Sequence, residues 1–356
     1  MMKIVTILGA RPQFVKAAAV SRAISGRSSL NEVIVHTGQH YDDNMSDIFF
    51  KEMNIPTPKY NLGVHGSSHS VMTGKMMEGI ETVLLSESPD WVLVYGDTNS
   101  TLAAALTASK LHMQVAHIEA GLRSFNMRMP EEVNRIVTDR LSNLLFCPTE
   151  AAVKNLRKEG FPHLSERIVL SGDVMQDAAM YYSKMSASKS DILERLSLGD
   201  FLLATVHRQE NTDDELRLRD IISALNELNS SVKVVMPVHP RTLKIIEGLS
   251  LEIQFVMIPP VGYFDMIELL KGCKLVLTDS GGLQKEAFFF GKGCLTLRDE
   301  TEWVELVDGG YNILCGSERG NIIDGYDRIS QSNPDYTIDL YGGGSASNRI
   351  VQELSL

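Results

Sequence analysis

The feature of this sequence that most constrains its fold is a regular alternation of short apolar runs with longer helical patterns. Residues within a run are apolar in succession, as expected for strands that are covered on both faces. Intervening stretches such as 101–111 and 150–159 fit helices. Strands that alternate with helices in this way predict an α/β fold with parallel sheets. The runs form a first set at 3–8, 33–36, 91–95, 115–118 and 144–147 and a second set at 201–206, 232–238, 253–258, 275–278 and 294–297.

Two sets of strands in a chain of 356 residues predict two domains. The boundary is expected between 167 and 198, where serines and lysines raise the polarity. We therefore predict an N-terminal domain at 1–170, a C-terminal domain at 171–340 and a terminal segment at 341–356. Ligands of such folds bind between the domains, at the carboxyl ends of the strands.

Composition argues against several classes of function. The net charge of −11 disfavours nucleic acid or an acidic membrane surface as the main partner. The four cysteines form no Cys-x-x-Cys, so neither a zinc site nor a redox pair is indicated. No apolar run approaches the roughly 18 residues of a membrane span. Because Arg11, Pro12 and Lys16 also interrupt the region where a signal peptide would be apolar, we expect a cytoplasmic protein without a metal.

Acidic and arginine side chains crowd one short stretch of the chain. Asp97 and Glu119 each follow an apolar run, so both are expected at strand ends that open onto one crevice of a parallel sheet. Glu131 stands at an expected helix start, directly after a proline. With Arg123 and Arg135 nearby, the three acids indicate proton transfers on an anionic substrate. The alternative is that the acids are only caps, but three of them with two arginines favour a site.

Further polar residues follow other predicted strands. Arg11 comes after the first strand and is suited to grip a phosphate, while Lys16 projects from the next helix. His207 and His239 follow strands of the second set and can donate to a phosphate oxygen. The alternatives are a surface arginine and capping histidines.

The strongest phosphate signal is a strand, a glycine turn and a helix at 278–286. Ser280, Gly281 and Gly282 let the backbone approach an anion at a helix N-terminus. Glu286, further along that helix, is suitably placed to accept from ribose hydroxyls. A tight turn that requires glycine is the alternative. Because neither Gly-x-Gly-x-x-Gly after a strand nor Gly-x-x-x-x-Gly-Lys-Ser/Thr occurs, tightly bound NAD and a P-loop have no support.

Together these motifs resemble the non-hydrolysing UDP-N-acetylglucosamine 2-epimerase family, over most of the chain. The resemblance implies two Rossmann-like domains of the GT-B type with a ligand cleft between them, a homodimer, a UDP-sugar substrate and no cofactor. The most specific pieces are Gly96-Asp97-Thr98-Asn99-Ser100, His117-Ile118-Glu119-Ala120-Gly121-Leu122-Arg123, Pro130-Glu131-Glu132-x-Asn134-Arg135 and Asp279-Ser280-Gly281-Gly282.

The chemistry that the resemblance implies is inversion at C2 of a UDP-2-acetamido sugar. UDP leaves by anti elimination to give a 2-acetamidoglycal and is re-added by syn addition. The resemblance assigns to the catalytic cleft Arg11, Lys16, Asp97, Glu119, Glu131, Arg135 and His207, and to the UDP it assigns Ser280, Gly281, Gly282 and Glu286. Further candidates for substrate binding are His239, Arg123 and Arg128.

Departures from the family pattern bear on the substrate. The loop at 124–129 is shorter than in members that act on UDP-N-acetylglucosamine, and Trp303 stands where an arginine is usual. Both features are similar to the branch that epimerises UDP-2,3-diacetamido-2,3-dideoxyglucuronate for surface polysaccharide. Arg128 would then contact the C6 carboxylate, and Trp303 or Met127 would cover the 3-acetamido methyl group. The alternative for Arg128 is an exposed loop arginine without a role in binding. Gln39-His40 is not soon followed by the arginine typical of the family's allosteric site, so we expect no such regulation.

Alternative functions are C2 epimerisation of UDP-N-acetylglucosamine to UDP-N-acetylmannosamine and a hydrolysing 2-epimerase that releases UDP. A nucleotide-sugar-binding regulatory protein is the alternative from another class. It would keep the UDP site but would not need three acids, so their presence favours an enzyme.

Overall fold

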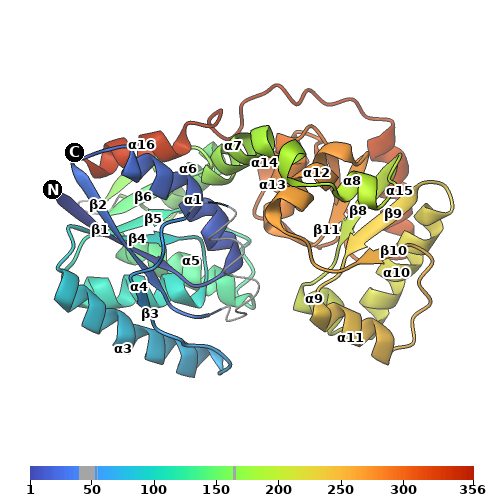
Figure 1. The fold of residues 1–356 in the computed structure, drawn as a ribbon. Helices are drawn as coiled ribbons and strands as arrows, with labels where there is room; N and C mark the ends of the chain where they lie inside the picture. The colour runs from blue at the N-terminus through green and yellow to red at the C-terminus, as the bar shows by residue number, and fades with distance from the viewer. Residues whose placement is uncertain (40–52, 54, 163–165) are drawn as a thin grey trace. The chain divides into compact units, whose positions relative to one another are not determined.

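A computed structural model describes residues 1–39, 53, 55–162 and 166–356. The chain forms two compact units, each built on its own parallel sheet (Figure 1). Unit 1 comprises Met1–Ala178 with Asp339–Leu356, and unit 2 comprises Ala179–Ile338. The predicted α/β class with two parallel sheets is therefore confirmed. His40 and the residues that follow it, on which the regulatory expectation depends, lie outside the described residues.

The sheet of unit 1 has seven parallel strands in the order β3-β2-β1-β4-β5-β6-β7. All five predicted runs of the first set are strands of this sheet. The two edge strands were not predicted, because β3 has only two residues and β7 is partly exposed along its whole length. The strands are β1 (Met2–Leu8), β2 (Leu30–His36), β3 (Tyr60–Asn61), β4 (Trp91–Tyr95), β5 (Val115–Ile118), β6 (Leu144–Cys147) and β7 (Arg167–Leu170).

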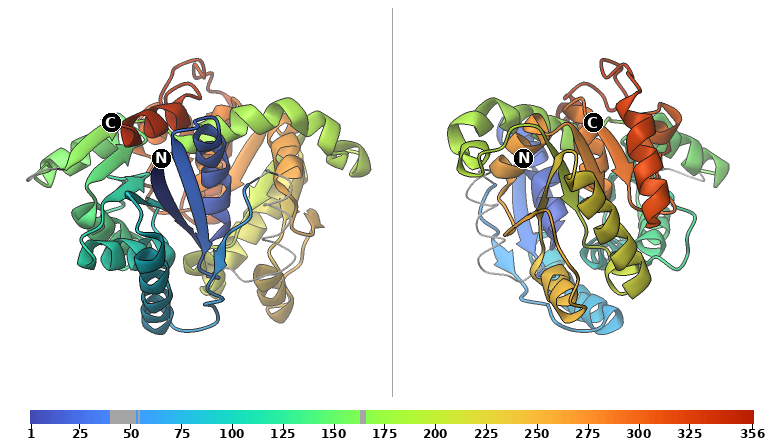
Figure 2. Two further views of the ribbon diagram at one scale, coloured as in Figure 1. Left: turned by 60° about the vertical axis from the view of Figure 1, so that its left-hand side comes forward. Right: turned by 90° about the vertical axis from the view of Figure 1, so that its right-hand side faces the viewer.

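Helices cover both faces of this sheet. Apolar residues of α3 and α4 pack with those of β1, β2 and β4 to form the core of one face. On the other face α1 packs against β2 and β4, and α16 lies beside α1 (Figure 2). The helices are α1 (Arg11–Ser25), α3 (His69–Glu87), α4 (Asn99–Lys110), α5 (Pro130–Leu141), α6 (Glu150–Lys158) and α16 (Ala346–Leu354), and α7 (Val174–Lys189) contains the division between the units.

The terminal helix α16 is held in unit 1 by polar contacts at both ends. Asp177 accepts hydrogen bonds from the backbone N–H groups of Ala346 and Ser347, at 3.1 and 2.7 Å, and from the Ser347 hydroxyl. Near the other end Arg167 pairs with Glu353. Asp177 thus satisfies donors that a helix N-terminus otherwise leaves without an intrahelical partner.

The sheet of unit 2 has six parallel strands in the order β10-β9-β8-β11-β12-β13. Its strands are β8 (Phe201–Thr205), β9 (Lys233–Pro237), β10 (Val256–Ile258), β11 (Leu275–Thr278), β12 (Gly293–Thr296) and β13 (Asn312–Leu314). One core joins the sheet to α10, α11 and α15, and a second core joins it to α8, α12 and α13. The helices are α8 (Ile192–Arg195), α9 (Gln209–Thr212), α10 (Glu215–Asn229), α11 (Pro240–Gly248), α12 (Tyr263–Gly272), α13 (Gly281–Phe289), α14 (Val304–Asp308) and α15 (Arg319–Ser330).

Both sheets reverse their strand order beside the first strand of the unit. In unit 1 β1 lies between β2 and β4, and in unit 2 β8 lies between β9 and β11. Ligands of open α/β sheets bind outside the carboxyl ends of the strands at such reversals. A ligand is therefore expected at the loops after β1 and β4 and at those after β8 and β11.

Glu32 is a carboxyl group inside unit 1 whose environment opposes its ionisation. One carboxylate oxygen accepts a hydrogen bond from Thr6 at 2.6 Å, and the other is buried near the Ser21 hydroxyl. Burial raises the pKa of Glu32, and the hydroxyl groups of Thr6 and Ser21 only partly offset this. The native protein thus holds this proton to a higher pH than the unfolded chain does.

We expect Glu32→Gln to increase the free energy of unfolding at neutral pH. A raised native pKa makes stability fall as the pH rises through the unfolded value and then through the native one. Below about pH 4 both states hold the proton, so the substitution should there have little effect. Chemical denaturation at the two pH values measures the difference, with exposed Glu81→Gln on α3 as the control. Equal effects of Glu32→Gln at both pH values would contradict the assignment.

Candidate active site

In unit 1 the predicted acids and cations follow three neighbouring parallel strands. Arg11 begins α1 after β1, Asp97 follows β4, and Glu119 directly follows β5. These strand ends meet at one edge of the sheet, and Lys16 approaches it from the second turn of α1. The side chain of Arg11 lies outside the described part of the structure.

Lys16 and Glu119 form a buried ion pair at this edge. The ammonium group contacts Glu119 Oε2, and each residue is only 8% exposed. Glu119 has a φ of +74°, which non-glycine residues rarely adopt, and such strained positions gather at functional sites. Its backbone N–H donates to the Phe146 carbonyl of β6 at 3.1 Å, which helps to hold this conformation.

Gly96 makes room for this ion pair. A Cβ atom on Gly96 would lie 3.1 Å from both the Lys16 ammonium and Glu119 Oε2, and the φ of Gly96 is +61°. Both the space and the backbone conformation therefore favour glycine. The glycine of the Gly96-Asp97 motif thus supports the acid that follows the neighbouring strand.

Arg135 links Asp97 to the helix that carries Glu131. Its Nε donates to Asp97 Oδ2 at 2.9 Å, and its Nη1 donates to the buried Glu132. Asn134 donates from its side chain to the Asp97 carbonyl at 2.8 Å, so two residues of α5 fix the position of Asp97. Arg135 is 1% exposed, and it therefore serves to orient Asp97.

Glu131 lies in the first turn of α5, four residues before Arg135 and hence on the same side of the helix. The residue is half-buried, and its carboxylate makes no hydrogen bond or ion pair with the described residues. The neighbouring Glu132 has a different task, because it accepts from Ser124 and from the N–H of Phe125 at 2.9 Å. Glu132, which sequence reasoning did not single out, shapes the loop at 124–129.

Arg123 does not join the acids, in contrast to the prediction that it binds substrate. Its Nε and Nη2 donate to Glu159 at 2.7 and 2.9 Å, and its Nη1 donates to Asp139 at 2.7 Å. Burial lowers the pKa of Arg123, but Glu159 and Asp139 more than offset this and raise it. A guanidinium that is 2% exposed and committed to two carboxylates supports the fold beneath the site. Arg128, in contrast, is exposed on its loop.

In unit 2 His207 is held by a buried acid that the sequence analysis did not name as a site residue. Asp279 Oδ1 lies 3.1 Å from His207 Nδ1, and the carboxylate also accepts from the backbone N–H of His207. Burial raises the pKa of Asp279, but the His207 side chain and the backbone donors more than offset this. The pKa of Asp279 therefore lies below the usual range. Asp279 therefore orients His207, whose side chain is half exposed.

The N-terminus of α13 carries the predicted phosphate motif. Ser280 caps the helix by accepting from the N–H of Leu283, and Gly281 begins it. Gly281 has no room for a side chain, because its Cβ would lie 2.6 Å from Glu302 Oε1. Glu286 is buried on the same helix and accepts from the Tyr263 hydroxyl at 3.0 Å.

The other predicted residues of unit 2 lie at helix starts. Gly282 is half-buried in the first turn of α13. His239 caps α11, because its Nδ1 accepts from the N–H of Arg241 at 3.2 Å. His239 therefore acts as a helix cap in this structure, as the alternative predicted, and the residue is exposed.

Trp303 is not positioned to cover a sugar methyl. The residue is 2% exposed, and the Lys285 ammonium lies 3.9 Å from the centre of its ring. Met127, which is 61% exposed, is the remaining candidate for that contact. Sequence reasoning missed two buried cations here: Lys285 lies on α13, and Arg298, which follows β12, donates to Glu302 at 2.9 Å.

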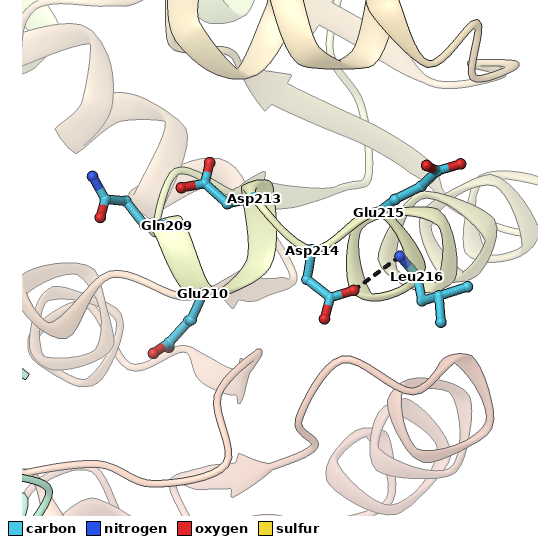
Figure 3. A pocket seen from close by; sticks show the side chains of 6 residues that line it. All are labelled: Gln209, Glu210, Asp213, Asp214, Glu215 and Leu216. Carbon is cyan, nitrogen blue, oxygen red and sulfur yellow. Dashed lines mark hydrogen bonds between the residues drawn. The ribbon is translucent and has the colours of Figure 1, made fainter. Parts of the chain in front are cut away.

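An open pocket in unit 2 is lined by residues of α9 and of the start of α10 (Figure 3). It is lined by Gln209, Glu210, Asp213, Asp214, Glu215 and Leu216. Asp214 is used as a cap, because it accepts from the N–H groups of Leu216 and Arg217 at 3.0 and 3.1 Å. Four carboxylates repel an anion, so this pocket is unsuited to a diphosphate.

Among the described residues no group of His, Cys, Asp and Glu side chains is arranged to hold a metal ion.

Two Rossmann-like units, with acids at the strand ends of the first and a glycine-opened helix start in the second, define a GT-B-type α/β protein. Residues 22–355 match the family model described as UDP-N-acetylglucosamine 2-epimerase. The chain is 56% identical to UDP-2,3-diacetamido-2,3-dideoxy-D-glucuronate 2-epimerase of Pseudomonas aeruginosa, over 99% of each chain. The chain therefore belongs to the UDP-N-acetylglucosamine 2-epimerase family.

Solved structures agree with this membership. The structure of Methanocaldococcus jannaschii UDP-GlcNAc 2-epimerase in complex with UDP-GlcNAc and UDP matches with a TM-score of 0.93 at 40% identity, over 99% of each chain. The Neisseria meningitidis enzyme bound to UDP-GlcNAc matches with a TM-score of 0.90 at 32% identity, over 99% of this chain and 100% of that one. No helix within the described ranges is long and apolar enough to cross a membrane.

Proposed function

We propose that this protein inverts C2 of a UDP-2-acetamido sugar by eliminating and re-adding UDP. The observation that carries the proposal is the group of Asp97, the Lys16–Glu119 pair and Glu131 at one sheet edge of a family member. The names of the Pseudomonas and Methanocaldococcus relatives, which are 2-epimerases, support the same reaction. Unit 2 would hold the uridine diphosphate of this substrate at the start of α13, beside His207.

The chemistry explains why both acids and a diphosphate site are needed. The C2 hydrogen of the sugar is not adjacent to a ring carbonyl, so its direct removal would be very slow. When the C1–O bond breaks, its electron pair leaves with UDP, and the cationic character at C1 makes the C2 proton acidic. A carboxylate then takes that proton and a C1=C2 double bond forms. UDP then adds back to C1, and a proton is delivered to C2 on the same face as UDP, which is opposite to the face from which the first proton was removed.

The proposed roles follow from charge. Asp97, Glu119 and Glu131 stabilise the developing cation and move protons. Lys16 carries the positive charge closest to Glu119, and with Arg11 it would balance the departing diphosphate. The N-terminus of α13 adds backbone N–H groups for the same anion.

We further propose UDP-2,3-diacetamido-2,3-dideoxyglucuronate as the substrate, epimerised to the mannuronate form for surface polysaccharide. The 56% identity to the Pseudomonas aeruginosa enzyme of that name supports this choice. Exposed Arg128 offers a partner for the C6 carboxylate. UDP-N-acetylglucosamine is the alternative, favoured by the names of the Methanocaldococcus and Neisseria relatives. We also propose a cytoplasmic homodimer, as the family resemblance suggests.

Turnover in deuterated water tests the elimination mechanism. We expect the product to carry deuterium at C2, because the removed proton exchanges with solvent before a proton is returned. Nuclear magnetic resonance of the product, formed without added NAD or metal, measures the incorporation. Product that retains its C2 hydrogen completely would exclude the mechanism, and release of free sugar with UDP would indicate a hydrolysing enzyme.

The substrate is tested by Arg128→Ala. We expect kcat/KM to be higher for UDP-2,3-diacetamido-2,3-dideoxyglucuronate than for UDP-N-acetylglucosamine. The substitution should lower the ratio of these two kcat/KM values about tenfold or more. Loss of an Arg–carboxylate contact affects only the substrate that has the carboxylate. Arg157→Ala, at another exposed arginine of unit 1, should leave the ratio unchanged. Efficient turnover of UDP-N-acetylglucosamine, with no response to Arg128→Ala, would contradict the substrate but not the reaction.

A further inference from the structure

His117 of β5 lies directly beneath the acid cluster, and both of its ring nitrogens face oxygen atoms. The residue is completely buried. Nδ1 lies 2.7 Å from Asp139 Oδ1, and Nε2 lies 2.7 Å from the carbonyl oxygen of Gly96. Both distances are those of strong hydrogen bonds to nitrogen.

Neither neutral form of the imidazole satisfies both contacts. A carbonyl oxygen can only accept, and Asp139 is ionised because it also accepts from Arg123 and from the N–H of Gly121. Burial raises the pKa of Asp139, but His117 and Arg123 more than offset this, so it remains below the usual range. A neutral imidazole donates from one nitrogen only and would turn the lone pair of the other onto an oxygen at 2.7 Å.

The charges next to His117 favour a positive imidazole ring. The groups that face it or its partners are Asp139 of α5, Arg123 after β5 and Glu159 after α6, which Arg123 holds through two hydrogen bonds. With an imidazolium this network has two positive and two negative charges. With a neutral ring the network would carry one net negative charge, shared between buried Asp139 and the partly exposed Glu159, and the share on Asp139 would be unfavourable. The Lys16–Glu119 pair beyond Gly96 is neutral in itself.

Both backbone polar groups of Gly96 form hydrogen bonds with residues of β5. Its N–H donates to the carbonyl of Ile118 at 2.9 Å, and its own carbonyl accepts from His117. Gly96 also borders the Lys16–Glu119 pair and directly precedes Asp97. Two predicted catalytic acids therefore depend on the position of this one glycine.

We infer that His117 is a doubly protonated imidazolium that positions the Gly96–Asp97 turn. It does not touch the substrate. Its charge favours ionised carboxylates above it, and its hydrogen bond fixes the turn. The protonation state stands on the geometry alone, whereas the consequence for catalysis rests on the proposed epimerase function.

The protonation state is measured directly on protein that contains ¹⁵N-labelled histidine. We expect one histidine to show both ring nitrogens bound to hydrogen in the folded protein at neutral pH, because each nitrogen of His117 faces an oxygen at hydrogen-bond distance. His117→Gln should remove that signal from the spectrum of the nine histidines. If this variant does not fold, replacing the other eight singly identifies the signal that persists. An unprotonated ring nitrogen on His117 at neutral pH would overturn the inference.

The positioning role is measured by kinetics. His117→Gln retains donors but not the charge, and we expect kcat to fall about 10- to 100-fold with the Kd for UDP within about threefold. The acidic limb of the kcat/KM profile should move to higher pH, because a lost positive charge makes carboxylates harder to ionise. Exposed His112→Gln is the control and should change neither quantity. An unshifted profile with wild-type kcat would refute the positioning role, even if the enzyme proves to be an epimerase.

Discussion

Replacement of Glu119 by glutamine is expected to lower kcat by roughly 100-fold or more. Glu119 is the acid with the strongest structural signs of function, since it combines a positive φ, burial and a paired ammonium group. Glutamine has nearly the same shape but neither takes up a proton nor stabilises a cation. The loss should therefore fall on transition states, and the Kd for UDP should change by less than about threefold.

Steady-state kinetics and calorimetry of UDP binding measure the two effects separately. The same pattern is expected for Asp97→Asn and Glu131→Gln. Glu150→Gln is a matched control, because Glu150 also begins a helix after a strand but is exposed. A wild-type kcat for any of the three acid variants would remove that residue from the catalytic group and return it to the role of a cap.

Strand positions and strand-end residues followed from the sequence because both depend on local patterns. Continuous apolar runs marked the central strands of both sheets, and polar residues directly after them lay at the carboxyl ends. The two edge strands of unit 1 lacked this signal, since β3 is too short and β7 is not buried on both faces. The domain limits at 170 and 340 stay predictions, as do the roles of the individual site residues.

The partners of buried charges could not be predicted, because they lie far away in the sequence. Arg123 stood beside the acids in the sequence and was therefore assigned to substrate. Its partners Asp139 and Glu159, which follow it by 16 and 36 residues, draw it into the fold beneath the site. Asp279 belonged to a recognised motif, but its contact with His207, 72 residues earlier, required the paired strands β8 and β11.

The three acids are therefore surrounded by more positioning contacts than the sequence motifs alone indicated. Arg135 and Asn134 hold Asp97, His117 holds Gly96, and Glu132 holds the loop at 124–129. Such contacts keep reacting groups in place while charge develops, which is how preorganised sites lower barriers. The geometry of the proposed catalytic group thus depends on several residues that are not themselves proposed to react.

The nucleotide site should be equally sensitive to a single methyl group at Gly281. A Cβ there would lie 2.6 Å from Glu302 Oε1, well inside van der Waals contact. Glu302 cannot easily retreat, because Arg298 holds its other oxygen at 2.9 Å and both residues are buried. Gly281→Ala must therefore displace either Glu302 or the N-terminus of α13.

We expect Gly281→Ala to raise the Kd for UDP by about tenfold or more, which corresponds to at least ~1.4 kcal/mol. Gly320→Ala, at a helical glycine of unit 2 with open space around it, should leave UDP binding unchanged. Calorimetric titration of UDP measures both. The cause is isolated by combining Gly281→Ala with Glu302→Ala, because removal of the colliding carboxylate should recover part of the lost affinity. Unchanged UDP affinity in Gly281→Ala would place the diphosphate away from the start of α13.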